Sequence, residues 1–476
     1  MTQNTGTPKI SRQRVGRIVF GCAILLLMAC LATSLLANAG LAAWALWTRW
    51  ELAQVQTRTA ELESQVQQLY QTLEENDVEI LPNQENEQLM DIVENKVPIL
   101  RGLYPAHPVE RALMTQGQLR ERMLQDLEDE FPPHEARDYA LALAAFDFID
   151  PDMDVYDLLL QLYTEQIAGF YDPETEQIYV IADLGLMGQM ERLTYAHEYT
   201  HALQDQHFDL EALGMRDDAE DEYDGEYLTA IRALVEGDAT LMQQQFLQSY
   251  YSPGEAIQLM QESLEIDTTV LDSVPPILRE SMYFSYIEGL AFVQALYADG
   301  GWAAVDAAYA NPPRSTEHIL HPDRSLAGDL PQLVSLPPLT DTLGAGWQQA
   351  DADTLGEYLT RLYLAQQIPD EQAEAAAAGW GGDRYAVHHR QADGALLMAL
   401  RTTWDTPADA EEFVDAYAAY AEGRFGHPAD TTGSARQCWT GTADHLCLTW
   451  TSTGVTIVLG PDRATVESVL ELTASE

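Results

Sequence analysis

The feature that most constrains this chain is the HExxH pattern of His197, Glu198 and His201, inside a segment (190–206) that reads as a helix. Residues four positions apart share one face of a helix, so both imidazoles can reach one metal ion while Glu198 faces a water beside it. Zinc suits this arrangement because it accepts neutral imidazole and, in catalytic sites, keeps one position open. The pattern therefore predicts a Zn²⁺ site with Glu198 as general base. The alternative is an ordinary amphipathic helix with surface histidines.

Two flanking segments favour the metal site. Residues 168–181 read as two short strands around an Asp-Pro turn, a hairpin whose edge an extended peptide could join as a further strand. Residues 228–241 read as a second helix. In that helix Glu236, 35 positions after His201, is the predicted third metal ligand.

Three residues near Glu236 bear on this assignment. Glu226 and Asp238 are alternative third ligands, and Asp238 is also a candidate to orient a ligand imidazole by hydrogen bonding. Gly237 has no Cβ, which would let this helix approach the metal helix closely.

With these residues the chain resembles the gluzincin type of zinc metallopeptidase, in which HExxH is followed by a glutamate on a later helix. The resemblance implies that His197, His201 and Glu236 bind zinc, that Glu198 is the general base, and that the substrate contains a peptide bond. The chain departs from the thermolysin-like version, where an aspartate follows the ligand glutamate after four residues, because Asp238 follows after two. Further stretches are similar to a group of poorly characterised bacterial zincin-like proteins: 169–173, 201–209 and 315–322.

Hydrolysis of this kind also needs a hydrogen-bond donor that stabilises the oxyanion formed from the carbonyl oxygen. The candidates are Tyr283, Tyr286, His318 and His321, of which we predict Tyr286 and His321 as catalytic. The two tyrosines fall in a segment with apolar residues at helical spacing, so packing explains them equally well. The two histidines follow two prolines in a loop-like stretch, where exposure is expected.

The N-terminal residues predict a membrane anchor. Residues 18–47 contain no charge and are long enough to cross a bilayer, and residues 1–17 before them are basic. This order predicts a single span with a cytoplasmic N-terminus and a catalytic domain outside the cell. Signal-peptidase cleavage at residues 37–39 and lipid attachment at Cys30 are the alternatives.

The segment after this span repeats apolar residues in steps of three and four over 51–76, which is typical of a coiled-coil stalk and of a homodimer formed through it. A single amphipathic helix lying against the protein body fits the same spacing. Residues 77–97 read as a polar linker.

Composition and charge limit the remaining possibilities. A hydrophobic content of 46% over 476 residues predicts two or more folded domains, assigned here to 98–370 and 379–476. The formal net charge of −51 repels nucleic acid, so we expect none as a partner. Cys438 and Cys447 flank a predicted hairpin turn on the oxidising side and are predicted to form a disulfide.

The predicted fold class is therefore α+β. It comprises a mostly helical zincin-like metallopeptidase domain with a small strand hairpin, an N-terminal transmembrane helix, a short coiled-coil stalk and a C-terminal α+β domain. The predicted function is that of a membrane-anchored, outward-facing zinc peptidase acting on a peptide or protein substrate. The alternatives are a non-catalytic ectodomain used for binding or sensing, and a stalked protein with structural zinc. Glu198 favours the peptidase, because a structural zinc site has no need of that carboxylate.

Overall fold

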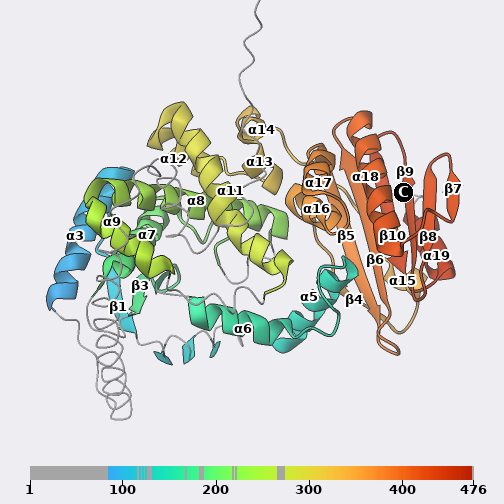
Figure 1. The fold of residues 1–476 in the computed structure, drawn as a ribbon, viewed down its shortest axis with the longest axis horizontal. Helices are drawn as coiled ribbons and strands as arrows, with labels where there is room; N and C mark the ends of the chain where they lie inside the picture. Colours follow the sequence, from blue (N-terminus) through green and yellow to red (C-terminus); the bar gives the residue numbers. More distant parts are fainter. Residues whose placement is uncertain are drawn as a thin grey trace, which may run out of the picture.

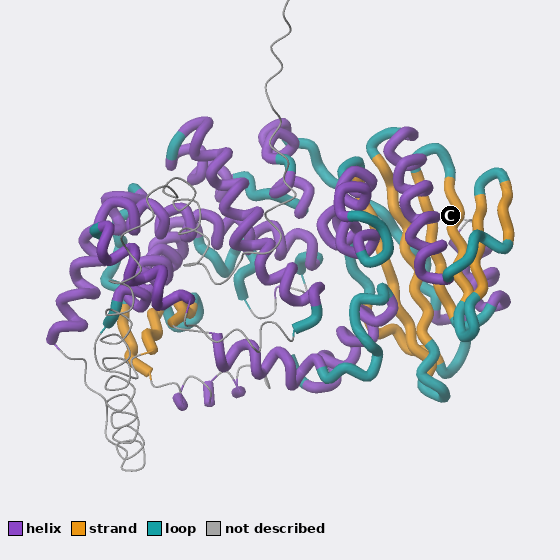
Figure 2. The backbone as a smooth tube through the Cα atoms, in the orientation of Figure 1, coloured by secondary structure: helices purple, strands orange, loops and turns teal. Residues whose placement is uncertain are grey.

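The computed structural model describes residues 84–473 apart from short gaps at 115–116, 119–120, 123, 126–130, 167–168, 182–186, 217–218, 220–221 and 265–273. The described elements form a mostly helical unit and a strand-rich unit that lie side by side (Figure 1). Figure 2 shows the same division, with helices dominating one side and a large sheet the other.

The helical unit is built around α7 (Gln189–Phe208) and α8 (Gly225–Tyr250), with α11 (Pro276–Gly300) crossing α8. The helix α8 begins at Asp224, whose side chain accepts a hydrogen bond from the backbone N–H of Tyr227. Shorter helices complete the unit: α9 (Pro253–Leu264), α12 (Trp302–Ala310), α13 (Thr316–Leu320) and α14 (Pro322–Ala327).

The first described element is the helix α3 (Gln84–Arg101), which packs against α7. Met90, Val93 and Val97 are fully buried at this contact. Their spacing of three and four residues is that of an amphipathic helix. This differs from the polar linker predicted over 77–97, because the polar residues of the first turn conceal the apolar spacing that follows.

A small sheet lies beside α7 and has the strand order β1 (Glu110–Met114), β3 (Gln177–Ile181), β2 (Gly169–Asp172). The antiparallel pair β2 and β3 occupies the place of the predicted hairpin. The strand β1 pairs with β3 in parallel. This order leaves β2 at an edge of the sheet, next to α7.

The strand-rich unit is one antiparallel sheet. Its strands, in spatial order, are β4 (Trp347–Asp351), β5 (Trp380–Arg390), β6 (Leu396–Trp404), β10 (Gly454–Gly460), β9 (His445–Trp450), β8 (Arg436–Thr440) and β7 (Thr431–Gly433). The predicted domain boundary between 370 and 379 falls inside this unit, because β4 pairs with β5.

Both faces of the large sheet are covered by helices, which gives the unit its own core. On one face α18 (Pro407–Phe425) and α16 (Gly356–Ala365) contribute Phe413, Tyr417 and Tyr363, all nearly inaccessible to solvent. The other face packs against α19 (Arg463–Thr473) and α15 (Thr340–Leu343). The remaining helix of this unit, α17 (Asp370–Ala377), packs on α16 and α18.

Two helices before the metal helix connect the units. The helix α5 (Pro133–Ala145) packs on β4, β5 and β6, and α6 (Val155–Gln166) follows it below the helical unit (Figure 1). Ala142 and Ala145 of α5 are buried in the core of the large sheet. Through these contacts α5 contributes to the core of the strand-rich unit.

The predicted disulfide is confirmed. Cys438 of β8 and Cys447 of β9 lie directly opposite one another and are bonded. Both residues are buried under α19.

The fold class predicted from the sequence has to be corrected. The described residues form an α+β protein, and among them no helix is both long and apolar enough to cross a membrane. The longest described helix, α8, carries Arg232, Glu236 and Asp238 in its middle, which suits the polar site described below and not a lipid environment. The predicted span at 18–47 and the stalk at 51–76 lie outside the described residues.

Candidate metal centre

The helix α7 presents His197 and His201 on its buried face. Leu193 and Ala196 of the same helix are fully buried, whereas both imidazoles retain a little exposure. The two rings are nearly perpendicular, with centroids 4.6 Å apart. Their four-residue spacing and shared face are therefore those predicted by the HExxH pattern.

Glu236 of α8 reaches both imidazoles. Its Oε2 lies 3.0 Å from His197 Nε2 and 3.5 Å from His201 Nε2. Donor atoms around a tetrahedral zinc ion with bonds of about 2.0–2.1 Å are about 3.3 Å apart, so these three side chains fit such an ion. Two imidazoles and one carboxylate also match the ligand types of open catalytic zinc sites.

Charge interactions inside this cluster are strong. Although burial alone would lower the pKa of His201, the Glu236 carboxylate raises it to about 9. Burial alone would raise the pKa of Glu236, but His201 and His197 hold it well below its usual range. Without a metal, the Glu236 carboxylate and the His201 imidazole thus form a buried ion pair, which a divalent cation can replace.

Glu198 lies on the same helix and points toward β2. Its Oε2 accepts a hydrogen bond of 3.0 Å from the backbone N–H of Tyr171. The hydroxyl of Tyr171 in turn donates to Asp205, at 2.8 Å, further along α7. Burial raises the pKa of Glu198 while the two histidines act in the opposite direction. A carboxylate with a raised pKa beside a metal is suited to accept and return a proton.

The alternative third ligands are occupied elsewhere. Glu226 accepts hydrogen bonds from the backbone and hydroxyl of Thr316, at 2.6 and 2.7 Å. Asp238 binds Arg101 through both carboxylate oxygens, at 2.6 and 2.9 Å. Glu236 is therefore the carboxylate that the fold brings to the two histidines.

Tyr286, a candidate oxyanion donor from the sequence, lies beside the cluster. It belongs to α11, and its ring centroid is 6.3 Å from that of His197. Tyr283, one turn earlier, packs against the core formed by α5 and α11 instead.

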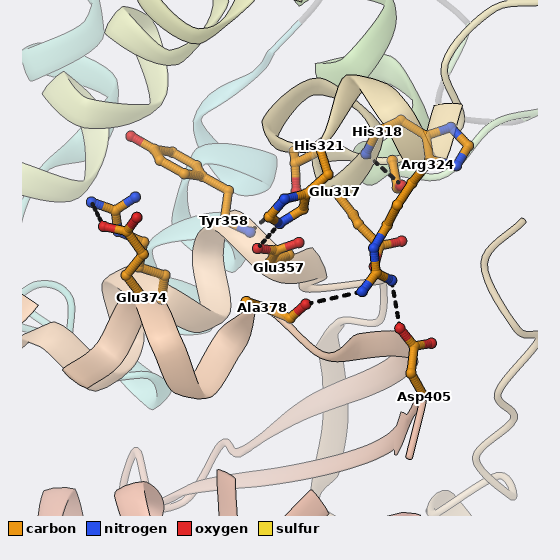
Figure 3. A network of polar contacts seen from close by, with 12 residues as sticks. Glu317, His318, His321, Arg324, Glu357, Tyr358, Glu374, Ala378 and Asp405 are labelled. Atoms are coloured by element: carbon orange, nitrogen blue, oxygen red, sulfur yellow. Dashed lines mark hydrogen bonds and ion pairs between the residues drawn. The ribbon is translucent and has the colours of Figure 1, made fainter. Parts of the chain in front are cut away.

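His321 lies elsewhere. Its Nε2 is 2.8 Å from Glu357 Oε1 on α16, and Figure 3 shows it facing that carboxylate near Arg324. The preceding helix α13 binds the first turn of α8 at Glu226. Ten residues separate Glu226 from Glu236, about 15 Å along a helix. His318, the fourth candidate, lies on α13 with its ring against the backbone of Arg314 and Asp329. The structure therefore brings neither histidine to the cluster.

Gly237 allows a close helix contact, but with α11 rather than with the metal helix.

Three residues near the cluster were not identified from the sequence: Tyr171, Gln204 and Arg101. Gln204 follows His201 by three positions and so shares its helix face, which is the one signal that the sequence contains. The contact of Arg101 depends on tertiary packing and leaves no local signal.

A second group with metal-binding side chains lies in the large sheet, where Cys438, His445 and Cys447 meet. The two sulfur atoms are bonded to each other, so this group offers no thiolate ligand.

Comparison with known proteins finds one family. Residues 342–470 match the family described as a domain of unknown function, DUF8575. This match coincides with the strand-rich unit and leaves out the histidine cluster. No curated protein and no solved structure matches the chain.

Proposed function

We propose that this protein is a zinc-dependent hydrolase that cleaves peptide bonds at the cluster of His197, His201 and Glu236. The observation that carries the proposal is the position of Glu236 Oε2, which lies within 3.5 Å of both imidazole Nε2 atoms of one HExxH helix. A structural site would need a fourth protein ligand. Among the described residues, the cluster contains these three only.

The three side chains would hold the metal, and Glu198 would work beside it. A zinc ion held there supplies Lewis acidity, which polarises a carbonyl group and makes water more acidic. Glu198 accepts a proton at its carboxylate from the attacking water and later delivers it to the amine that leaves. The backbone N–H of Tyr171 keeps this carboxylate oriented.

Tyr286 is the proposed donor for the oxyanion. Its ring is close to that of His197, and we propose that its hydroxyl donates a hydrogen bond to the oxygen of the scissile carbonyl. The strand β2 lies at an edge of the small sheet and runs beside α7. We propose an extended peptide as the substrate, because such a peptide can pair with a strand edge through backbone groups other than Tyr171 N–H, which already donates to Glu198.

Digestion of a broad peptide library tests the proposal. Purified full-length protein with added zinc should cleave peptides, and a chelator should stop the cleavage. The variant Glu198→Gln should bind zinc but cleave nothing, whereas Glu211→Gln, at an exposed position after α7, should behave as the wild type. Equal cleavage by wild type and Glu198→Gln would contradict the proposed role of Glu198. Zinc binding without cleavage by either protein would favour a binding or sensor module.

A further inference from the structure

Gln204 lies behind the proposed metal centre, at the ring nitrogen of His201 opposite the one that faces Glu236. It is fully buried, and its Oε1 lies 2.8 Å from His201 Nδ1. Its amide nitrogen donates two hydrogen bonds, one of 3.0 Å to the backbone oxygen of Val235 and one of 2.9 Å to Asp238 Oδ2. Both of these partners are acceptors only.

The orientation of this amide decides which nitrogen of His201 carries a proton. Because the –NH₂ group must face Val235 O and Asp238, the oxygen of Gln204 must face His201. An amide oxygen only accepts, so His201 Nδ1 must be the donor. In the neutral ring the lone pair is then on Nε2, the atom that faces Glu236.

Asp238 is held in turn by groups from two other helices. Arg101 of α3 pairs with both of its oxygens, and Tyr309 of α12 donates to Oδ2 at 2.8 Å. Arg101 and Asp238 are completely buried. Arg101 also pairs with Asp306 at 2.7 Å and stacks on the ring of Trp302. The carboxylate that holds Gln204 is therefore neutralised and fixed.

We propose that Gln204, Asp238 and Arg101 are positioning residues that lock His201 in the tautomer able to bind the metal. This inference rests on the proposed zinc site. Asp238 acts on His201 through Gln204, because its carboxylate accepts from the amide whose oxygen meets His201 Nδ1. The ligand imidazole therefore has a neutral partner, and the negative charge lies one side chain further away. A neutral partner makes the imidazole less basic than a carboxylate in direct contact would.

Zinc affinity tests the inference without relying on catalysis. Competition with a chromophoric chelator measures the dissociation constant of zinc for the full-length protein, and thermal melting of the metal-free protein checks folding. Gln204→Met preserves size but removes the acceptor, and it should weaken zinc binding about 10- to 100-fold. The matched control is Gln206→Met, which changes a glutamine of the same helix that contacts Ala106 and His107. Its affinity should equal that of the wild type.

A variant of Asp238 tests the next residue of the chain of contacts. Asp238→Asn removes one of the two carboxylates that pair with Arg101 and weakens the acceptor of the Gln204 amide. It should therefore weaken zinc binding, in the same direction as Gln204→Met.

The outcomes distinguish the two proposals. Failure of the wild type to bind zinc would overturn the proposed function and this inference together. Wild-type affinity in a folded Gln204→Met variant would overturn the inference alone, leaving the zinc site in place. Wild-type affinity in a folded Asp238→Asn variant would remove Asp238 and Arg101 from the proposal.

Discussion

Gly237 of α8 lies directly against Gly289 of α11. A Cβ atom added to Gly237 would be 2.2 Å from the carbonyl oxygen of Gly289, and one added to Gly289 would be 2.2 Å from the carbonyl oxygen of Ala233. The two helix backbones are thus in contact with no side chain between them. Because Glu236 precedes one glycine and Tyr286 precedes the other by three residues, this crossing brings both side chains to the histidines of α7.

Replacing either glycine should therefore damage both stability and the site. We expect Gly237→Ala to lower the free energy of unfolding by about 1–3 kcal/mol or more, because the methyl group must force the backbones apart. Zinc affinity should fall as well, since Glu236 would move with α8. Chemical denaturation and chelator competition measure the two effects.

The control is Gly254→Ala in α9, where the nearest atom to an added Cβ is 3.9 Å away. It should change stability little. Unaltered stability in both Gly237→Ala and Gly289→Ala would show that the helices do not cross at this contact.

Tyr286 and His321 should differ in their effect on catalysis. Loss of one oxyanion donor costs about 10²–10³-fold in kcat, so Tyr286→Phe should cause a loss of this size while zinc remains bound. Tyr283→Phe, one turn earlier on the same helix, is the matched control and should keep kcat. His321→Gln should also keep kcat, because its ring pairs with Glu357 away from the cluster. Steady-state kinetics on a cleaved library peptide measures these changes. Normal kcat in Tyr286→Phe would remove it from the mechanism.

The disulfide should stabilise the strand-rich unit without affecting zinc. Replacing both Cys438 and Cys447 by alanine should lower the stability of this unit by about 2–3 kcal/mol, the loop-entropy value for so short a hairpin. Zinc stoichiometry should be unchanged, since the bond lies in the large sheet and the cluster in the helical unit. Differential scanning calorimetry and metal analysis test both statements. A loss of zinc in this variant would contradict the separation of the two units.

The strand-rich unit should become less stable in mild acid through His388. This residue of β5 is 1% exposed, and neither ring nitrogen has a hydrogen-bond partner among the described residues. Burial, with a smaller effect of His389, lowers the pKa of His388 below its unfolded value of 6.5. The neutral ring therefore contributes stability that is present above pH 6.5 and lost as the pH falls through the lowered pKa.

The comparison of wild type with His388→Leu isolates this contribution. Burial raises the pKa of Asp353 and of Asp383 to about 6, which favours the folded state in acid and opposes the histidine. The variant keeps both carboxylates, so the difference between the two melting curves reports the histidine alone. We expect the melting temperature of the wild type to fall, relative to that of His388→Leu, between pH 7.5 and pH 5. Parallel pH profiles would contradict this prediction.

The sequence predicted the parts of the site that depend on local spacing. His197 and His201 share a face because four residues make about one helical turn, and Glu236 was assigned from the pattern of a later helical glutamate. Tyr286, one of four candidates for the oxyanion donor, lies beside the cluster. His321 was predicted to be catalytic because a loop-like stretch after two prolines suggested exposure. In the structure its ring pairs with Glu357 instead and lies away from the cluster.

The remaining features depend on contacts between distant segments. Asp238 interacts with Gln204 and Arg101 across 34 and 137 positions of the chain, and no local pattern marks such pairs. The same holds for β1, whose five residues form a strand only because they pair with β3. The sequence analysis also left β4 out of the C-terminal domain. In the sequence β4 is separated from its partner strand β5 by the helices α16 and α17, so no local pattern links the two strands.

The zinc content of the purified full-length protein tests the central claim most directly. Elemental analysis after dialysis should find one zinc ion per chain in the wild type and in Glu198→Gln. It should find almost none in His197→Ala, His201→Ala or Glu236→Ala, because each removes one of the three donor atoms. Absence of zinc from wild-type protein supplied with the metal, or a full zinc complement in Glu236→Ala, would contradict the account.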